Sequence, residues 1–543
     1  MKLLLLCIKW LWHSVHGIRL SLFVSGTIGI IQVGLSLTFI WASKQMIDIA
    51  TSKCDGHLMT YILLAIGCMA GQPLLSALST RLKSKAEIKQ RNALQYRLFN
   101  HLIHSKWSGR ESLHTADMTN RMDDDVNVVT TAMCWTIPSI FVTCIQLAGA
   151  LIFLAHMDIR LALVLIVIMP MAILLSKGYV RKMRRLTKEI RESDSRVKSY
   201  MQEHLGHRAL ITAMQQEDSV SEKFFDLIGN YGRQILYRTN YTLFSRTVVQ
   251  WGFSAGYLTA FLWGVLGLRD GSVTFAMMTT FLQLVAQIQR PIVELSRQIP
   301  SFIHVSTSID RLTQIEELPV EEESPSTPLG DAPGIRMADI SYTYPEGKEP
   351  TISHFTHDFA PGTVTALIGE TGIGKSTLTR LMLAQITPQE GKITFYNHQG
   401  EEVQAGVGTR CNIVYIPQGN TLLSGTIRSN LLLGNPNATE EEICQSLYIA
   451  AADFVHELPD GLDSICGEKG VGLSEGQAQR IAIARGLLRS GGIVVMDEPT
   501  SSLDAETERT LLKRLSENLT GKTFVIVTHR ILPAEFCDTT VKL

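Results

Sequence analysis

Long apolar stretches alternate with polar segments before residue 300 of the chain. Six of them approach the ~20 apolar residues that a helix needs to cross the ~30 Å hydrocarbon core of a bilayer. Because a spanning segment must satisfy its backbone hydrogen bonds internally, we expect each of the six to be a helix. The pattern therefore predicts an all-α, six-helix transmembrane domain. The stretches cover residues 20–43, 58–80, 126–157, 161–176, 247–268 and 271–289.

The connections between these stretches differ in length and charge. The two long ones, residues 81–125 and 177–246, hold 9 and 14 Lys and Arg residues, whereas the three short ones hold 4 together. Because positively charged loops stay on the cytosolic side, we expect the long loops, the N-terminus and the C-terminal part to be cytosolic. The chain would then be a multi-pass protein of the cytoplasmic (inner) membrane. Apolar residues at helical spacing predict that both long loops are helical extensions, with turns near residues 114–120 and 205–212.

The pattern also divides the chain into four parts. Residues 1–18 combine an apolar run with two Trp and two Lys residues, which predicts an amphipathic helix at the membrane interface. Residues 19–315 form the transmembrane domain. Residues 316–333 are acidic and rich in Pro and Ser, as is typical of an exposed linker. In residues 334–543, short β-rich runs alternate with helical ones, which predicts an α/β domain with a short C-terminus.

Charge and cysteine content exclude some function classes. The formal net charge is −1, from 50 Lys and Arg against 51 Asp and Glu, so no global charge favours nucleic acid as a partner. The nine cysteines form no Cys-x-x-Cys pair and have no His residues at metal-ligand spacing. We interpret them as free thiols.

A phosphate-binding loop follows the apolar run at residues 364–368. The segment 369–377 reads Gly-Glu-Thr-Gly-Ile-Gly-Lys-Ser-Thr and matches the pattern G-x-x-x-x-G-K-[ST] between a strand and a helix. Its glycines let backbone N–H groups surround the phosphates of a nucleotide. Lys375 is expected to meet the β- and γ-phosphates and Ser376 to ligate Mg²⁺, so the predicted cofactors are ATP and Mg²⁺. The predicted ATP-binding residues of the loop are Gly369, Thr371, Gly372, Gly374, Lys375, Ser376 and Thr377.

A second apolar run, residues 492–496, ends in two carboxylates. A continuous apolar run is typical of a fully buried parallel strand, and α/β sheets bind ligands at the carboxyl ends of such strands. Asp497 is therefore placed to hold Mg²⁺ through water, and Glu498 to polarise the attacking water.

Between these motifs lies Leu473-Ser-Glu-Gly-Gln, which resembles the signature Leu-Ser-Gly-Gly-Gln of ATP-binding cassette (ABC) transporters. Together with the phosphate loop, this segment makes the whole chain similar to an exporter-type half-transporter, in which a membrane domain precedes a P-loop nucleotide-binding domain. Ser474 and Gly476, which face the γ-phosphate in the family, are kept. Glu475 replaces a glycine of the family signature and adds a negative charge near ATP, so the ATP affinity is expected to differ from that of the family.

The resemblance implies further site residues. Tyr344 matches the aromatic residue that stacks on adenine, although an exposed strand tyrosine is the alternative. Gln418 matches the glutamine that contacts Mg²⁺ and the water, and His529 the switch histidine that contacts the γ-phosphate. Ser502 and Asp504 match the loop that crosses to a second domain. The implied catalytic residues are Glu498, His529 and Gln418, and the implied Mg²⁺ ligands are Ser376, Gln418 and Asp497.

In this family, two nucleotide-binding domains close head to tail, so the chain needs a second identical or related half-transporter. The signature residues Leu473, Ser474, Gly476 and Gln477 would then act on the ATP of the partner. Both half-sites are intact, which favours a homodimer. Only 14 residues follow His529, which puts a regulatory or dimer-supporting tail in doubt.

The resemblance implies ATP-driven transport of an amphipathic substrate, which can be a lipid, a peptide or a drug-like compound. An importer of siderophore-like compounds on the same fold is the alternative, and six spans disfavour a non-transport ATPase. The predicted turns near Ala116 and Leu210 resemble the coupling helices of the family. Polar side chains within the spans, such as Gln146 and Gln287, are interpreted as hydrogen-bonding neighbouring helices rather than lining a path.

Overall fold

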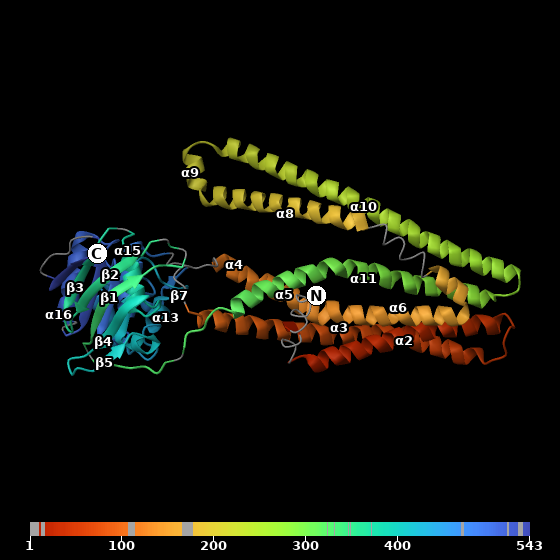
Figure 1. Cartoon of the computed structure of the whole chain (residues 1–543), viewed down its shortest axis with the longest axis horizontal. Helices are drawn as coiled ribbons and strands as arrows, with labels where there is room; N and C mark the ends of the chain where they lie inside the picture. Colours follow the sequence, from red (N-terminus) through yellow and green to blue (C-terminus); the bar gives the residue numbers. More distant parts are fainter. Residues whose placement is uncertain are drawn as a thin grey trace. The chain divides into compact units, whose positions relative to one another are not determined.

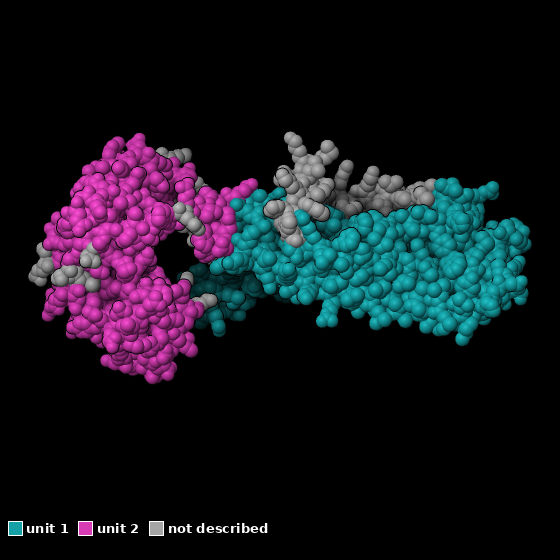
Figure 2. All heavy atoms as spheres, turned by 90° about the horizontal axis from the view of Figure 1, so that it is seen from below, with its two compact units in different colours: residues 1–99, 119–316 teal, residues 100–118, 317–543 magenta. Residues whose placement is uncertain are grey.

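The computed structural model divides into two compact units, shown in teal and magenta in Figure 2. The first, here called the helical unit, comprises residues 1–99 and 119–316. The second, the α/β unit, comprises residues 100–118 and 317–543. The structure describes residues 10–11, 17–106, 115–165, 177–322, 324–330, 332–345, 347, 349–370, 372–467, 472–518, 521–529 and 536–543.

Long helices build the helical unit (Figure 1). Several of them continue far beyond the apolar stretches into charged sequence. Two π-helical segments, Arg121–Asp125 and Ala132–Thr136, lie between α4 and α6. The helices are α2 (Arg19–Ala50), α3 (Leu58–Ile103), α4 (Thr115–Asn120), α5 (Val126–Thr131), α6 (Ile137–Met157), α8 (Lys177–Gly206), α9 (Arg208–Ala213), α10 (Glu217–Arg269) and α11 (Phe275–Glu316).

Four helical segments in the described residues are long and apolar enough to cross a membrane. They are Arg19–Ala50, Leu58–Ile103, Asp117–Met157 and Glu217–Arg269. The fourth predicted stretch, 161–176, falls mostly outside the described residues. The sixth, 271–289, lies largely on α11, which is not among the four. Three glutamines and an arginine interrupt the apolar sequence of this helix and lower its mean hydropathy, namely Gln283, Gln287, Gln289 and Arg290.

Hydrogen bonds join three helices inside the apolar core of this unit. Gln146 Nε2 of α6 donates to Gln287 Oε1 of α11 at 2.5 Å. Gln287 Nε2 in turn donates to Ser36 Oγ of α2 at 2.8 Å. Fully buried side chains such as Phe281 and Leu284 belong to the same core. Gln287 of α11 is therefore hydrogen-bonded to both α6 and α2, which lowers the cost of placing amides among apolar side chains.

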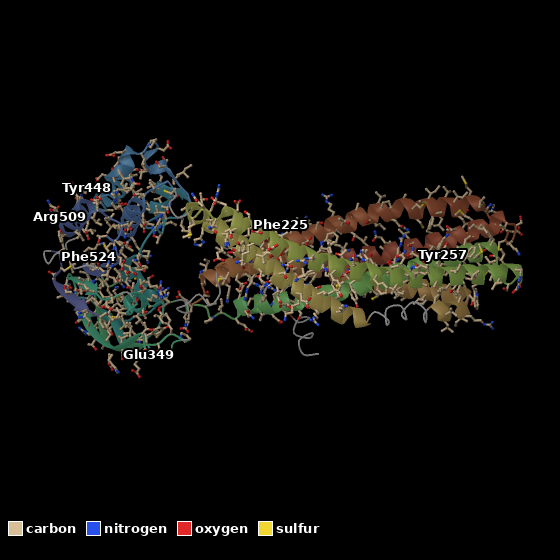
Figure 3. The ribbon with its side chains drawn as sticks, turned by 90° about the horizontal axis from the view of Figure 1, so that it is seen from above. Phe225, Tyr257, Glu349, Tyr448, Arg509 and Phe524 are labelled. Carbon is tan, nitrogen blue, oxygen red and sulfur yellow. The ribbon has the colours of Figure 1, made fainter. Side chains whose placement is uncertain are left out.

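The α8–α9–α10 segment forms a hairpin, with α9 at its turn (Figure 1). Figure 3 labels two aromatic residues along α10, Phe225 and Tyr257, and both are exposed. Tyr257 lies within the predicted fifth span.

Two sheets form the centre of the α/β unit. The parallel sheet has the strand order β11-β3-β10-β9-β6, and the antiparallel sheet has the order β2-β1-β4-β5; β7 and β8 pair separately. The strands are β1 (Gly334–Tyr342), β2 (Ile352–Phe359), β3 (Val364–Ile368), β4 (Glu390–Tyr396), β5 (Glu402–Gln404), β6 (Ile413–Ile416), β7 (Gly425–Thr426), β8 (Ile465–Cys466), β9 (Ile493–Asp497), β10 (Thr523–Thr528) and β11 (Thr539–Lys542). The helices are α12 (Lys375–Met382), α13 (Ile427–Leu432), α14 (Glu440–Ile449), α15 (Glu475–Leu487) and α16 (Ala505–Asn518).

The central strands of the parallel sheet are buried along their whole length. Every residue of β9 and β10 is buried, as a strand covered on both faces requires. Phe524 of β10, labelled in Figure 3, belongs to this core. Because parallel strands share one carboxyl edge, the residues after β3, β6, β9 and β10 meet there.

The linker, predicted as exposed, is held against the rest of the α/β unit by hydrogen bonds. Most described residues of 317–330 are exposed, but Leu329 is buried. Leu329 N donates to Asn412 Oδ1 at 2.8 Å, and Thr327 N donates to Gly408 O at 3.0 Å. The segment therefore lies along the α/β unit. The predicted interfacial helix at residues 1–18 lies almost wholly outside the described residues.

Candidate functional site

The phosphate-loop glycines adopt backbone conformations that favour glycine. Gly372 has φ +91° and Gly374 has φ +117°, both in the left-handed region. A Cβ at Gly374 would lie 2.6 Å from Ile352 Cδ1 and 2.9 Å from Thr351 O. The start of β2 therefore leaves room only for glycine before α12. Thr371, also predicted to bind ATP, lies outside the described residues.

Lys375 is the first residue of α12 and is buried. Its Nζ donates to Gly369 O at 2.5 Å and to Glu370 O at 3.3 Å. The loop carbonyls thus hold the ammonium group against the loop that would surround the phosphates. Ser376 and Thr377 follow on the first turn of the helix, where its positive end favours an anion.

Three predicted catalytic residues come together at the carboxyl edge of the parallel sheet. Gln418 Nε2 donates to Glu498 Oε2 at 2.7 Å. His529 Nδ1 lies 3.0 Å from Glu498 Oε1. Glu498 itself has φ +46°, a strained conformation for a residue with a Cβ, and its N–H donates to Val527 O at 2.8 Å. The strained backbone therefore places a carboxylate between an amide and an imidazole.

Asp497 ends β9 and is 6% exposed. Burial raises the pKa of its carboxyl group, and the neighbouring Glu498 raises this pKa further. The charges of Lys375 and Arg380 act in the opposite direction. Burial, with a contribution from Asp497, also raises the pKa of Tyr415 to about 12. The ionised form of Asp497 is thus disfavoured unless a cation lies beside it.

The raised pKa gives a stability prediction. The folded chain holds the Asp497 proton more tightly than the unfolded chain, so this contribution to stability falls as pH rises from 3.8 through the folded pKa. At neutral pH, Asp497→Asn should therefore raise the unfolding temperature of the nucleotide-free protein. The expected rise is about 2–4 °C for each kcal/mol by which the substitution increases the free energy of unfolding. The same variant should lose the extra stabilisation that Mg²⁺ adds to ATP. Thermal unfolding with and without Mg²⁺-ATP measures both effects.

The matched control is Asp504→Asn. Hydrogen bonds from Thr507 lower the pKa of Asp504, so the same substitution there should not raise the unfolding temperature. A higher unfolding temperature in both variants would contradict the burial argument.

The phosphate loop, Gln418, Asp497, Glu498 and His529 line one cavity. Its volume of about 630 Å³ is typical of ligand sites. Ser376, Gln418 and Asp497 all line it, so their oxygens suit Mg²⁺ held jointly with phosphates. In the part of the chain that the structure describes, no cluster of three or more His, Cys, Asp or Glu could hold a metal by itself. The lining residues are Tyr344, Thr351, Gly372, Gly374, Lys375, Ser376, Thr377, Arg380, Gln418, Asp497, Glu498 and His529.

Tyr344 lies at the wall of this cavity. Its Oη is 3.1 Å from Thr377 Oγ1 and accepts a hydrogen bond from Arg380 Nη1 at 3.0 Å. Its ring packs edge-on against Tyr342, with 5.1 Å between the centroids. The tyrosine is therefore fixed beside the phosphate loop, where a base could stack on it.

The stacking role predicts how two substitutions of Tyr344 differ. Tyr344→Ala should weaken ATP binding about 5- to 150-fold, because stacking on an aromatic ring contributes about 1–3 kcal/mol. Tyr344→Phe keeps the ring and loses only the bonds to Thr377 and Arg380, so it should bind ATP much more tightly than Tyr344→Ala. Fluorescent-nucleotide titration measures both affinities. Equal losses in the two variants would assign the effect to the hydroxyl group.

The signature segment forms the start of α15 and does not line this cavity. Ser474 is the N-cap residue: its Oγ accepts from Gln477 N at 3.2 Å, while Gln477 Oε1 accepts from Ser474 N at 2.9 Å. A Cβ on Gly476 would lie 2.8 Å from Ser502 O. Gly476 thus lets the predicted crossing loop approach the signature. Asp504, in that loop, caps α16 by accepting from Thr507 N at 3.0 Å.

Two site residues were absent from the sequence prediction. Arg380 lines the cavity. Its position five residues after Lys375, on the helix that follows the phosphate loop, could have marked it as a site residue. Gln479 is fully buried, and its Nε2 donates to Glu498 O at 2.8 Å. A glutamine two residues beyond the signature has no recognisable pattern, because the role of Gln479 depends on how α15 packs against the parallel sheet.

Known protein families match both the helical part and the α/β part of the chain. The family described as "ABC transporter transmembrane region" matches residues 22–292, and the family "ABC transporter" matches residues 352–501. An ABC transporter ATP-binding protein of Sinorhizobium fredii is 29% identical over 454 residues, covering 82% of this chain and 77% of the relative. An ATP-dependent lipid A-core flippase of Desulfotalea psychrophila is 27% identical, covering 96% of this chain and 92% of the relative.

The fold agrees with a solved structure of a bacterial Atm1-family ABC exporter with ATP bound. The TM-score is 0.80 at 20% sequence identity, and the match covers 97% of this chain and 93% of the exporter. A helical transmembrane domain thus precedes a nucleotide-binding domain in one chain. The chain belongs to the ABC transporter family, as a half-transporter of the exporter type.

Proposed function

We propose that this chain is one half of a dimeric pump of the inner membrane, which uses ATP hydrolysis to move a lipid-like amphipathic substrate. The observation that carries the proposal is the meeting of Glu498 with Gln418 and His529 at the phosphate-loop edge of the sheet. The relatives named as lipid A-core flippases, which match along nearly the whole chain, support the substrate class.

The site residues divide the work of hydrolysis. The phosphate loop and Lys375 bind the β- and γ-phosphates, and Tyr344 stacks on the base. Glu498 accepts a proton from the attacking water or orients it, and Gln418 and His529 fix the carboxylate from both sides. Mg²⁺, held by Ser376, Gln418 and Asp497, would neutralise charge on the phosphates. Because Gln418 and His529 already hold the Glu498 carboxylate, this group itself would move little before the attack.

The proposed dimer is supported by the absence of the signature residues from the lining of the cavity. Leu473, Ser474, Gly476 and Gln477 do not line the cavity that holds Lys375 and Glu498. Ser474 and Gly476 begin α15, whose positive end suits a phosphate. A second copy, placed head to tail, would bring its signature to this ATP. Both half-sites are present in one sequence, which supports a homodimer with two competent sites.

Transport requires that ATP and substrate each bind one conformation of the pump more tightly than the other. A lipid-like substrate should therefore stimulate hydrolysis in a membrane. The test is ATPase activity of the purified full chain in liposomes, with added lipid A-type glycolipid, hydrophobic peptide or hydrophobic cation. The expected result is stimulation by the glycolipid, together with ATP-dependent movement of a labelled glycolipid between leaflets.

The control is the Glu498→Gln variant in the same liposomes, which should give neither activity. Stimulation by the peptide or the cation alone would contradict a lipid-like substrate. Accumulation of the tested compound on the cytosolic side would contradict export.

A further inference from the structure

One arginine fixes the start of the linker to the α/β unit. Arg410 donates from Nη1 and Nη2 to the two carboxylate oxygens of Glu321, each at 2.7 Å. Such a bidentate pair is among the stronger ion-pair geometries. The Arg410 hydrogen bond, with the charges of Lys106 and His104, lowers the pKa of the Glu321 carboxyl against an opposing effect of burial. Glu321 is therefore a carboxylate at neutral pH, with Arg410 and Lys106 as its neighbouring cations.

Glu321 also belongs to a short bridge between the segments that follow α3 and α11. Ser105 and Val320 form an antiparallel β-bridge, and Glu321 N donates to His104 O at 2.9 Å. One imidazole nitrogen of His101 lies 3.0 Å from the carbonyl oxygen of the nearby Leu318. All of these residues belong to the α/β unit. The last residues of α3 and the first residues after α11 are thus one anchored piece.

The same guanidinium group binds the C-terminal end of α12. Arg410 Nε donates to Leu383 O at 2.8 Å, and Nη2 donates to Ala384 O at 2.8 Å. These carbonyls lie at the end of the helix, where a cation also interacts favourably with the helix dipole. Ala384 has φ +48°, a conformation that persists only when surrounding contacts fix it. Since α12 begins at Lys375, one side chain joins the linker to the phosphate-loop helix.

Arg410 reaches the catalytic edge through its backbone as well. It lies in the 3₁₀ helix Val407–Asn412, which leads directly into β6. Gln418, the partner of Glu498, follows two residues after β6 ends. A shift of Arg410 therefore acts on both the phosphate loop and the catalytic glutamine.

We infer that Arg410 is a positioning residue that links the joined ends of α3 and α11 to the phosphate-loop helix. Through the Glu321–Arg410 pair, movement of these two membrane helices reaches α12 and Gln418 within the same chain. This route runs through the linker and is distinct from the predicted coupling segments near Ala116 and Leu210, which lie in α4 and α9. The inference rests on the proposed function, because it concerns how ATP hydrolysis is coupled to the membrane helices.

The test compares Glu321→Gln with wild type in the full chain, reconstituted in lipid nanodiscs. Glu321→Gln removes the charge at the linker and leaves the bonds from Arg410 to Leu383 and Ala384. Hydrogen exchange is measured with and without ATP plus vanadate, in the phosphate loop and in loops 51–57 and 270–274 on the predicted external side. The expected result is unchanged ATP affinity and unchanged protection of the phosphate loop, with loss of the response in both external loops.

Arg410→Gln should lose the external response and also weaken ATP binding, because it removes the bonds to α12 as well. The matched control is Glu402→Gln, which breaks the exposed pair of Glu402 with Arg336 at 2.8 Å in the same unit and should respond like wild type. A normal external response in Glu321→Gln, or weakened ATP binding in that variant, would overturn the inference. Absence of the external response in wild type would instead overturn the proposed function.

Discussion

Glu498→Gln should abolish steady-state ATP hydrolysis while ATP still binds. Removing a general base lowers the rate by about 10²–10⁴-fold. The amide keeps the size of the carboxylate, and its oxygen can still accept the hydrogen bond from Gln418 Nε2. It cannot take a proton from water, and His529 no longer faces a negative charge. Phosphate release measures the rate, and fluorescent-nucleotide titration measures the affinity.

The matched control for this prediction is Glu441→Gln. Glu441 is an exposed residue of the first turn of α14, so its substitution should leave hydrolysis unchanged. Hydrolysis by Glu498→Gln at the wild-type rate would show that another group activates the water. Loss of nucleotide binding would instead give Glu498 a role in holding the phosphate loop.

The sequence was informative where a motif and an apolar run coincide. The runs that become β3 and β9 carry the phosphate loop and the Asp497–Glu498 pair at their ends, so their shared edge could be predicted. A helical membrane domain could be predicted as well, because apolar length alone decides whether a helix can span.

Contacts between distant residues could not be predicted in this way. Glu321 and Arg410 are separated by 89 positions, and neither lies in a motif. The amide of Gln479 reaches the backbone of Glu498 only because α15 packs against the parallel sheet. The linker composition predicts exposure, but burial of Leu329 depends on Asn412 offering a side-chain oxygen to its N–H. Such contacts depend on tertiary packing, which local composition does not specify.

Gly476→Ala should also abolish ATP hydrolysis, because it alters the signature at the start of α15 rather than the phosphate-loop side of the site. The added Cβ would lie 2.8 Å from Ser502 O, and this close neighbour is backbone rather than a flexible side chain. The start of α15 must therefore shift, and a misplacement of about 1 Å costs on the order of 10²-fold in rate. Binding of ATP to the phosphate loop of the same chain should be nearly unchanged, because Gly476 does not line that cavity.

Combining the two substitutions tests whether the sites form between chains. Differently tagged chains are co-expressed, and mixed dimers are purified through both tags. If each site joins the phosphate loop of one chain to the signature of the other, Glu498→Gln paired with Gly476→Ala places both defects in one site. The second site is then intact, so a mixture of two inactive variants should regain activity.

Placing both substitutions on one chain, opposite a wild-type partner, damages both sites and should give no activity. If each site instead forms within a single chain, the two single variants paired together should be inactive. The double variant paired with wild type should then be active, because the wild-type chain keeps its own site. The two arrangements therefore differ in which mixed dimer hydrolyses ATP, and a measurement of phosphate release decides between them.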